Sequence, residues 1–196
     1  MRLKIPAALA LFAAASTFGL AVQAQQAPPP SLVPLLIEST AFADGGIVPP
    51  KFVARGDNVQ PGFRISHAPE GVASYAIIFH DIDVARSGGV DDVLHWVAWN
   101  IPGSTTEIAE GKLPEGSVTG KNVRGQNAYM GPGAPAGPRY HHYVFEFYAL
   151  SVKLDLPAET TTRAELLAAM NGKVLAKAAY VGRYRGEPAP AAAPPR

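Results

Sequence analysis

The sequence contains no cysteine, and this absence excludes several kinds of chemistry. Thiol catalysis, iron–sulfur clusters and cysteine-based zinc sites are impossible. Disulfide bonds are impossible as well, so the folded chain has to be stabilised by its core. Enough apolar material is present for that purpose, because 47% of the 196 residues are hydrophobic and only 17% are charged.

An excess of charge of either sign is also missing. The chain has 17 Lys and Arg against 16 Asp and Glu, which gives a formal net charge of +1, and its basic residues do not gather in any one stretch. A nucleic-acid partner would require a basic face. We therefore expect no binding to nucleic acid.

Short motifs of several enzyme classes are absent too. The sequence has no G-x-S-x-G, no H-E-x-x-H, and no Gly-Lys-Ser/Thr after Gly131-Pro132-Gly133. Ser87 and Ser104 lie in predicted turns without a strand–turn–helix context. The sequence therefore offers no clear nucleophile, and we expect no cofactor.

The first 24 residues have the pattern of an export signal. Arg2 and Lys4 precede a mostly apolar run over Ile5–Val22, and Val22-Gln23-Ala24 forms a small-x-small cleavage site. The run is Ala-rich and interrupted by polar residues, whereas a stable membrane span needs about 20 strongly apolar residues. We predict cleavage near Ala24, a periplasmic or secreted protein, and no transmembrane span in the mature chain.

The rest of the chain divides by composition into three parts. Residues 25–34 are polar and Pro-rich and are predicted to form a linker. Residues 187–196 are rich in Pro and Ala and are predicted to be disordered. Residues 35–186 have the length of one domain.

Turn residues are frequent, with 19 Gly and 19 Pro, which favours an all-β or mixed architecture. A helix is predicted over Thr162–Met170, because Thr162 and Glu165 form a capping box and Asn171-Gly172 is a helix-stop signal. The Pro-rich segment Val48–Phe52 is expected to be extended. Apolar runs bounded by turn residues predict strands at Gly62–Ser66, Ala73–Phe79, Val93–Ile101, His141–Leu150 and Val174–Tyr184, and one beginning in Leu35–Phe42.

One stretch of the chain combines a stiff loop with an aromatic strand. Gly131–Pro138 consists of Gly and Pro with small residues between them, so it forms a shaped loop rather than a regular element. His141 and Tyr143 then lie on one face of the following strand, about 6–7 Å apart along it, while His142 lies on the other face. The pair could line a polar pocket, or both residues could be ordinary half-buried strand residues.

Four candidates for chemistry fall at predicted strand ends or in adjacent loops: Asp81, His95, His141 and Tyr143. Imidazole N–H groups and a phenol would bind an anionic oxygen, and a carboxylate would set the charge of a histidine. Taken singly, Asp81 is also a normal turn acid and His95 a normal core histidine. A metal site is a rival interpretation, but His141 and His142 point to opposite faces, and we expect no metal.

Five segments carry a family resemblance, in order along the chain. Gly56-Asp57-Asn58-Val59-Gln60-Pro61 is similar to a G-x-N-x-S-P segment, and His80-Asp81-Ile82-Asp83 to a D-P-D-x-P motif. Leu94–Pro102 is similar to an H-W-x-x-x-N-I-P strand. Tyr129–Tyr143 is similar to a segment ending in G-x-H-R-Y, and Gly172–Tyr184 to a closing helix-to-strand segment. Together these motifs resemble the phosphatidylethanolamine-binding protein family, in particular its bacterial Raf kinase inhibitor-like proteins.

The resemblance implies a fold and a site. The fold would be a mostly β, sandwich-like domain with a large central antiparallel sheet, a smaller sheet and one or two short helices. The pocket would bind phosphate-like or other anionic groups. The residues that match the family's pocket are Asp81, His95, His141 and Tyr143, with Ala134 and Pro135 at the rim.

This chain departs from the family motifs at several positions. Ile82 and Ala85 replace both prolines of D-P-D-x-P, which leaves the shape of the pocket lip open. Ala134 replaces a proline of the loop, and His142 replaces the arginine of H-R-Y. We expect His142 to act on the outer face of its strand.

The leading functional hypothesis is an exported, non-enzymatic binding protein. His95, His141 and Tyr143 would donate hydrogen bonds to a small anionic or phosphorylated group, and Asp81 would orient a histidine and favour its protonated form. One alternative is an inhibitor of a protease or kinase-like partner. Another is a hydrolase that uses His95 or His141 as a base.

Overall fold

The computed structural model describes residues 34–86, 88–159 and 162–187. The predicted signal peptide, residues 25–33 of the predicted linker and the predicted tail beyond Glu187 lie outside the described residues, so these three predictions remain predictions. No helix in the described residues is long and apolar enough to cross a membrane.

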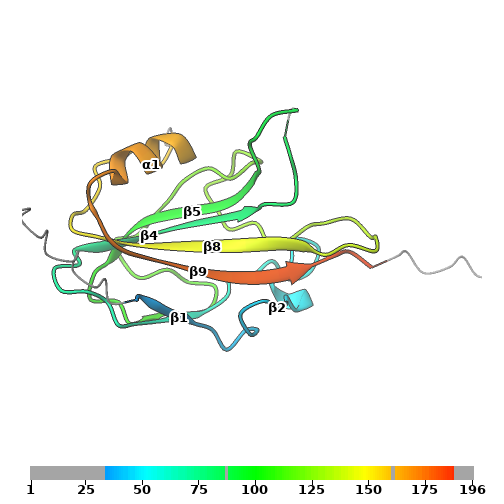
Figure 1. The fold of residues 1–196 in the computed structure, drawn as a ribbon, viewed down its shortest axis with the longest axis horizontal. Coiled ribbons are helices and arrows are strands. Elements are labelled where there is room, and N and C mark those ends of the chain that lie inside the picture. The colour runs from blue at the N-terminus through cyan, green and yellow to red at the C-terminus, as the bar shows by residue number, and fades with distance from the viewer. Residues whose placement is uncertain (1–33, 87, 160–161, 188–196) are drawn as a thin grey trace, which may run out of the picture. The chain divides into compact units, whose positions relative to one another are not determined.

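Two β-sheets and one α-helix make up the described chain (Figure 1). The smaller sheet has the strand order β1-β3-β6 and is antiparallel. The larger sheet has the order β2-β9-β8-β4-β5-β7, and only the pairing of β2 with β9 is parallel. The bounds are β1 Leu36–Glu38, β2 Gly46–Ile47, β3 Phe63–Ser66, β4 Ser74–Asp81, β5 Val93–Pro102, β6 Glu107–Ile108, β7 Val118–Thr119, β8 His141–Leu150, α1 Arg163–Met170 and β9 Val174–Tyr184.

The centre of the larger sheet is buried on both faces. All eight residues of β4, at the centre of the sheet, are buried. On one face, called here the inner face, Phe79 stacks on Phe145 with 3.8 Å between ring centroids, and the smaller sheet packs over them through residues such as Phe63. On the outer face, Leu166 and Met170 of α1 pack against the sheet. This arrangement confirms the predicted mostly β fold with a large central sheet, a smaller sheet and short helices.

Local signals predicted most elements correctly. The helix begins after Thr162, whose side chain accepts a hydrogen bond from the Glu165 amide while the Glu165 carboxylate accepts one from the Thr162 amide, as a capping box requires. The expectation of an extended Val48–Phe52 is wrong, because Pro50–Phe52 forms a 3-10 helix. Proline is favourable in the first turn of a helix, where its missing N–H has no partner to lose.

Candidate functional site

The candidate site forms where β4 ends. Because β5 and β8 both run antiparallel to β4, each of them begins beside the residue at which β4 finishes. Asp81, the last residue of β4, is paired with Val93 on β5 and with Tyr143 on β8. The sheet therefore brings together segments that are far apart in the sequence.

His95 reaches the inner face of the sheet because β5 carries a bulge. Phe79 of β4 is paired with Trp96, but the next residue of β4 is paired with Leu94, so His95 is an extra residue. Val97 packs on the outer face, and regular alternation would place His95 there too. The bulge instead turns the His95 ring inward, where it lies 5.3 Å from the ring of Phe79.

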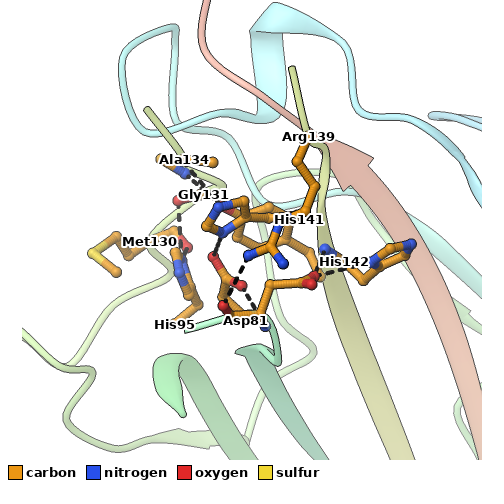
Figure 2. Close-up of polar contacts among 11 residues, drawn as sticks. Asp81, His95, Met130, Gly131, Ala134, Arg139, His141 and His142 are labelled. Carbon is orange, nitrogen blue, oxygen red and sulfur yellow. Dashed lines mark hydrogen bonds and ion pairs between the residues drawn. The ribbon is translucent and has the colours of Figure 1, made fainter. Parts of the chain in front are cut away.

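A cavity of about 250 Å³ lies at these strand ends. Figure 2 shows the side chains that converge on it from β4, β5, β8 and the Gly/Pro loop. The apolar part of its wall includes Val84 and Val93. Its lining includes every residue predicted for the site, namely Asp81, His95, Ala134, Pro135, His141 and Tyr143.

The carboxylate of Asp81 organises the polar part of the cavity. Its Oδ2 atom lies 2.8 Å from Nδ1 of His141, and its Oδ1 atom accepts a hydrogen bond from the Asp83 amide at 3.0 Å. Asp81 is 3% exposed, so its negative charge is poorly solvated and depends on these donors. The contact fixes the orientation of the His141 ring and leaves its Nε2 atom without a partner among the described residues.

Tyr143 ties the Gly/Pro loop to the sheet. Its buried hydroxyl oxygen accepts hydrogen bonds from the backbone amides of Gly133 at 3.3 Å and Ala134 at 3.0 Å. Burial raises the pKa of Tyr143, and the charge of Asp81 and a hydrogen bond to it raise the pKa further. The phenol therefore stays protonated and is fully engaged by protein groups.

His95 is held by backbone carbonyls. Its Nδ1 atom lies 2.9 Å from the carbonyl oxygen of Met130 and 3.1 Å from that of Gly131. Carbonyls only accept hydrogen bonds, so Nδ1 carries a proton. Burial lowers the pKa of His95 despite the opposing influence of these carbonyls and of Asp81, so the ring is neutral at neutral pH. The Nε2 atom then carries a lone pair and has no partner among the described residues.

Comparison with known proteins gives the family. The family model described as phosphatidylethanolamine-binding protein matches residues 38–185. The chain belongs to the phosphatidylethanolamine-binding protein family. The match confirms the resemblance carried by the five motifs, and it contains every residue that lines the cavity.

Individual relatives agree with this assignment. The UPF0098 protein of Methanothermobacter thermautotrophicus is 36% identical over 154 residues, which are 76% of this chain and 97% of the relative. The candidate lipoprotein LppC of Mycobacterium tuberculosis is 35% identical over 159 residues, which are 81% of this chain and 76% of the relative. The crystal structure of Escherichia coli YbcL, described as a new member of the mammalian PEBP family, has a TM-score of 0.71 at 27% identity and covers 78% of this chain and 99% of its own.

In this chain, hydrogen bonds to His142 hold the segment after β4 that forms the lip of the cavity. The amide of Ile82 donates to the carbonyl of His142 at 3.2 Å, a bond that the family's proline could not make. The Asp83 carboxylate lies 2.6 Å from the amide and 2.9 Å from Nδ1 of His142. Burial alone would raise the pKa of Asp83, but these bonds and the charge of Arg139 lower it. His142 is exposed and does not line the cavity, as predicted from its place on the strand.

One charged residue of the lining was missed in the sequence. Arg124 lies at the cavity in the segment that follows β7, and its guanidinium forms no hydrogen bond or ion pair within the described part of the chain. Its positive charge lowers the pKa of His95 in addition to the effect of burial. The segment around Arg124 has mixed polarity and several glycines, so no local signal marked it.

A second polar network lies on the outer face of the sheet. His80 is 2.5 Å from the Asp92 carboxylate through Nδ1, and Asp92 also pairs with Arg163 of α1. The Glu146 carboxylate lies 2.6 Å from Nζ of Lys177. This network joins α1 to the sheet and is separated from the cavity by the sheet itself.

No group of three or more His, Cys, Asp or Glu among the described residues is arranged to hold a metal ion.

Proposed function

We propose that this protein is an exported, non-enzymatic binding protein that holds a small anionic or phosphorylated group in the cavity. The observation that carries the proposal is the pair of histidines. In both His95 and His141 the Nδ1 atom is fixed by protein oxygens, whereas Nε2 has no partner among the described residues. Rings that are already oriented lose little freedom on binding, so such a site is pre-organised.

Other features of the lining support an anion. Arg124 places a positive charge at the cavity, and Pro135 of the lining is exposed to solvent. The carboxylate of Asp81 accepts hydrogen bonds from the His141 ring, the Asp83 amide and the Tyr143 hydroxyl. These donors reduce its repulsion toward an incoming anion. In this proposal Tyr143 and Ala134 shape the cavity through their mutual hydrogen bond, and the histidines contact the ligand.

The chemistry of the lining supports binding rather than turnover. Among the described residues that line the cavity none is Ser, Thr or Lys, so the residues that most often act as nucleophiles are not at hand. Asp81 is the one carboxylate of that lining, and its oxygens are already hydrogen bonded. A hydrolase would need a nucleophile or an activated water, and nothing in the lining identifies either.

Calorimetric titration with methyl phosphate tests the proposal. The unmodified protein is expected to bind with modest affinity, and His141→Ala is expected to weaken binding at least about tenfold because a charge-assisted hydrogen bond is lost. His67→Asn is the matched control, since His67 is exposed and Asn tolerates its positive φ. Absence of binding by the unmodified protein, or equal affinity in His141→Ala, would contradict the proposal. Release of methanol from methyl phosphate would contradict the non-enzymatic part.

Export is supported by the N-terminal pattern and by the name of one relative, a candidate lipoprotein. Expression of the full chain in a Gram-negative host, followed by fractionation and N-terminal mass analysis, tests it. The expected product is periplasmic and begins at Gln25. Ala24→Pro is expected to leave the precursor uncleaved. A full-length cytoplasmic product from the unmodified chain would contradict export.

A further inference from the structure

We infer that the cavity selects a phosphomonoester in its monoanionic form, which still carries one P–OH group, over oxyanions that have no proton to donate. This inference rests on the proposed function and adds to it the protonation state of the ligand. It assigns opposite roles to the two imidazoles: Nε2 of His95 accepts a hydrogen bond, and Nε2 of His141 donates one.

The role of His95 follows from its partners. The Met130 and Gly131 carbonyls force the proton onto Nδ1. A second proton on Nε2 would create a cation in a residue that is 4% exposed. No carboxylate is hydrogen bonded to the ring in the described chain to compensate that charge. The unprotonated Nε2 atom is therefore the atom that His95 offers to a ligand.

The cavity lining holds four charged or titratable groups besides His95. Asp81, at the end of β4, favours a second proton, whereas Arg124 disfavours it. Tyr143 on β8 crosses the His95 ring edge-on with 5.2 Å between centroids, and it remains neutral because burial raises its pKa. His141 on β8 is the remaining titratable group of the lining. Burial outweighs the attraction of Asp81, so the pKa of His95 lies below its usual value.

The role of His141 follows from a different environment. Its Nδ1 atom faces the Asp81 carboxylate at 2.8 Å, so a second proton on this ring is compensated by a negative charge at hydrogen-bond distance. The His141 side chain is also more exposed, at 13%. The imidazolium form of His141 then presents an Nε2–H donor.

Together the two rings present one acceptor and one donor to the cavity. A phosphomonoester monoanion matches both, because its P–OH donates to His95 while an unprotonated oxygen accepts from His141. A sulfate ester of the same shape and charge has no O–H and would place an oxygen lone pair against the Nε2 lone pair. An unsatisfied buried acceptor of this kind weakens binding by roughly ten- to a hundredfold.

Three small ligands separate this account from simple charge attraction. The methyl phosphate monoanion, methyl sulfate and dimethyl phosphate each carry one negative charge, but only the first has an O–H group. At about pH 6.5 roughly a quarter of methyl phosphate is the monoanion, because the second pKa of a phosphomonoester is about 6. After correction for that fraction, calorimetry should show methyl phosphate binding at least about tenfold more tightly than either of the other two.

The pH dependence of the affinity ratio supplies a second signature. Methyl phosphate loses its O–H as pH rises, whereas methyl sulfate does not change, so their affinity ratio should fall about tenfold per pH unit above about pH 7. The contribution of His141 is common to both ligands and cancels in the ratio. A ratio that is constant with pH would overturn the inference.

Two matched substitutions assign the roles. In His95→Asn the side-chain amide can still donate to the Met130 and Gly131 carbonyls, but the Nε2 acceptor is removed. Methyl phosphate should then bind at most about twofold more tightly than methyl sulfate. His141→Asn should weaken both ligands by the same factor and keep the preference. If His95→Asn does not fold, the pH series on the unmodified protein decides alone. If methyl sulfate binds as tightly as methyl phosphate and the protein takes up one proton on binding it, His95 is a donor and the inference is overturned.

The binding of the three ligands distinguishes a failure of this inference from a failure of the proposed function. If none of the three ligands binds, the proposed function fails; if all bind equally, only the selectivity fails. Sedimentation with phosphatidylcholine vesicles that contain phosphatidic acid identifies the source of the phosphomonoester. Sedimentation abolished by methyl phosphate supports a lipid head group, and binding of methyl phosphate without sedimentation supports a free small molecule.

Discussion

The carboxylate of Asp81 and the imidazole of His141 meet at 2.8 Å across sixty residues of sequence. The contact exists because β4 ends where β8 begins. The same carboxylate also binds the amide of Asp83 and the hydroxyl of Tyr143, so it connects both strands to the loop that follows β4. Changes at this carboxylate should therefore affect stability and ligand binding together.

Asp81→Asn keeps the shape of the side chain but removes its charge and one acceptor. We expect the free energy of unfolding to fall by about 1–3 kcal/mol, because buried donors lose their partner. Ligand affinity should fall about tenfold, since His141 loses its orientation and its compensating charge. Urea unfolding and calorimetry measure both effects, with the exposed Asp155→Asn as control. Tighter binding by Asp81→Asn would show that repulsion by the carboxylate dominates, contrary to this account.

Tyr143→Phe removes the hydroxyl that holds the Gly/Pro loop. The amides of Gly133 and Ala134 lose their acceptor, so they should exchange faster with solvent and the protein should be about 1–3 kcal/mol less stable. Hydrogen exchange followed by NMR measures the effect residue by residue. Tyr148→Phe is the control, because its hydroxyl donates to Glu146 on the outer face. Unchanged exchange at Gly133 and Ala134 would argue against the positioning role of Tyr143.

Gly131→Ala tests the backbone that orients His95. A Cβ atom at Gly131 would lie 2.1 Å from the carbonyl oxygen of Phe52, so the loop has to shift. We expect a loss of stability of about 1–3 kcal/mol and weaker ligand binding, because the carbonyls that hold His95 move with the loop. Gly137→Ala lies in the same loop with open space around it and should have little effect on either quantity. Similar results for both variants would contradict the tight packing at Gly131.

Acid sensitivity should depend on Glu146. Burial alone would raise the pKa of Glu146, but the hydrogen bond and ion pair with Lys177, together with His80 and Tyr148, hold that pKa below its usual value. A carboxyl group with a lowered pKa stabilises the fold above its unfolded pKa of about 4.3 and loses this contribution as pH falls through the folded pKa. Glu146→Gln should therefore flatten the decline of unfolding free energy below about pH 5, unlike the exposed Glu115→Gln. Parallel curves for the unmodified protein and Glu146→Gln would contradict this.

The main strands could be predicted from the sequence because each is a long apolar run with clear ends. Ala73–Phe79 and Val93–Ile101 correspond to β4 and β5 within two residues at either end. The aromatic alternation of β8 also placed His141 and Tyr143 on the cavity side and His142 on the other. These features depend on neighbours in sequence, and local patterns report them well.

The features that were missed depend on contacts between distant residues. Regular alternation along β5 would point His95 outward with Val97, and only the bulge against β4 turns it to the cavity. The carbonyls of Met130 and Gly131, which set the tautomer of His95, carry no signal in the side-chain sequence. The family resemblance pointed to His95, which the structure places in the cavity lining, but it could not give the hydrogen-bonding role of the ring.

An NMR titration of the protein with ¹⁵N-labelled histidine tests whether a ligand binds in the cavity through His95 and His141. The chain has five histidines, so exposed His67 and outer-face His142 serve as internal controls. Addition of methyl phosphate should shift the Nε2 resonances of His95 and His141 saturably and with one common affinity, and leave the His67 ring unchanged. Unmoved His95 and His141 resonances at saturating ligand, or equal movement of all five rings, would contradict a binding site in the cavity.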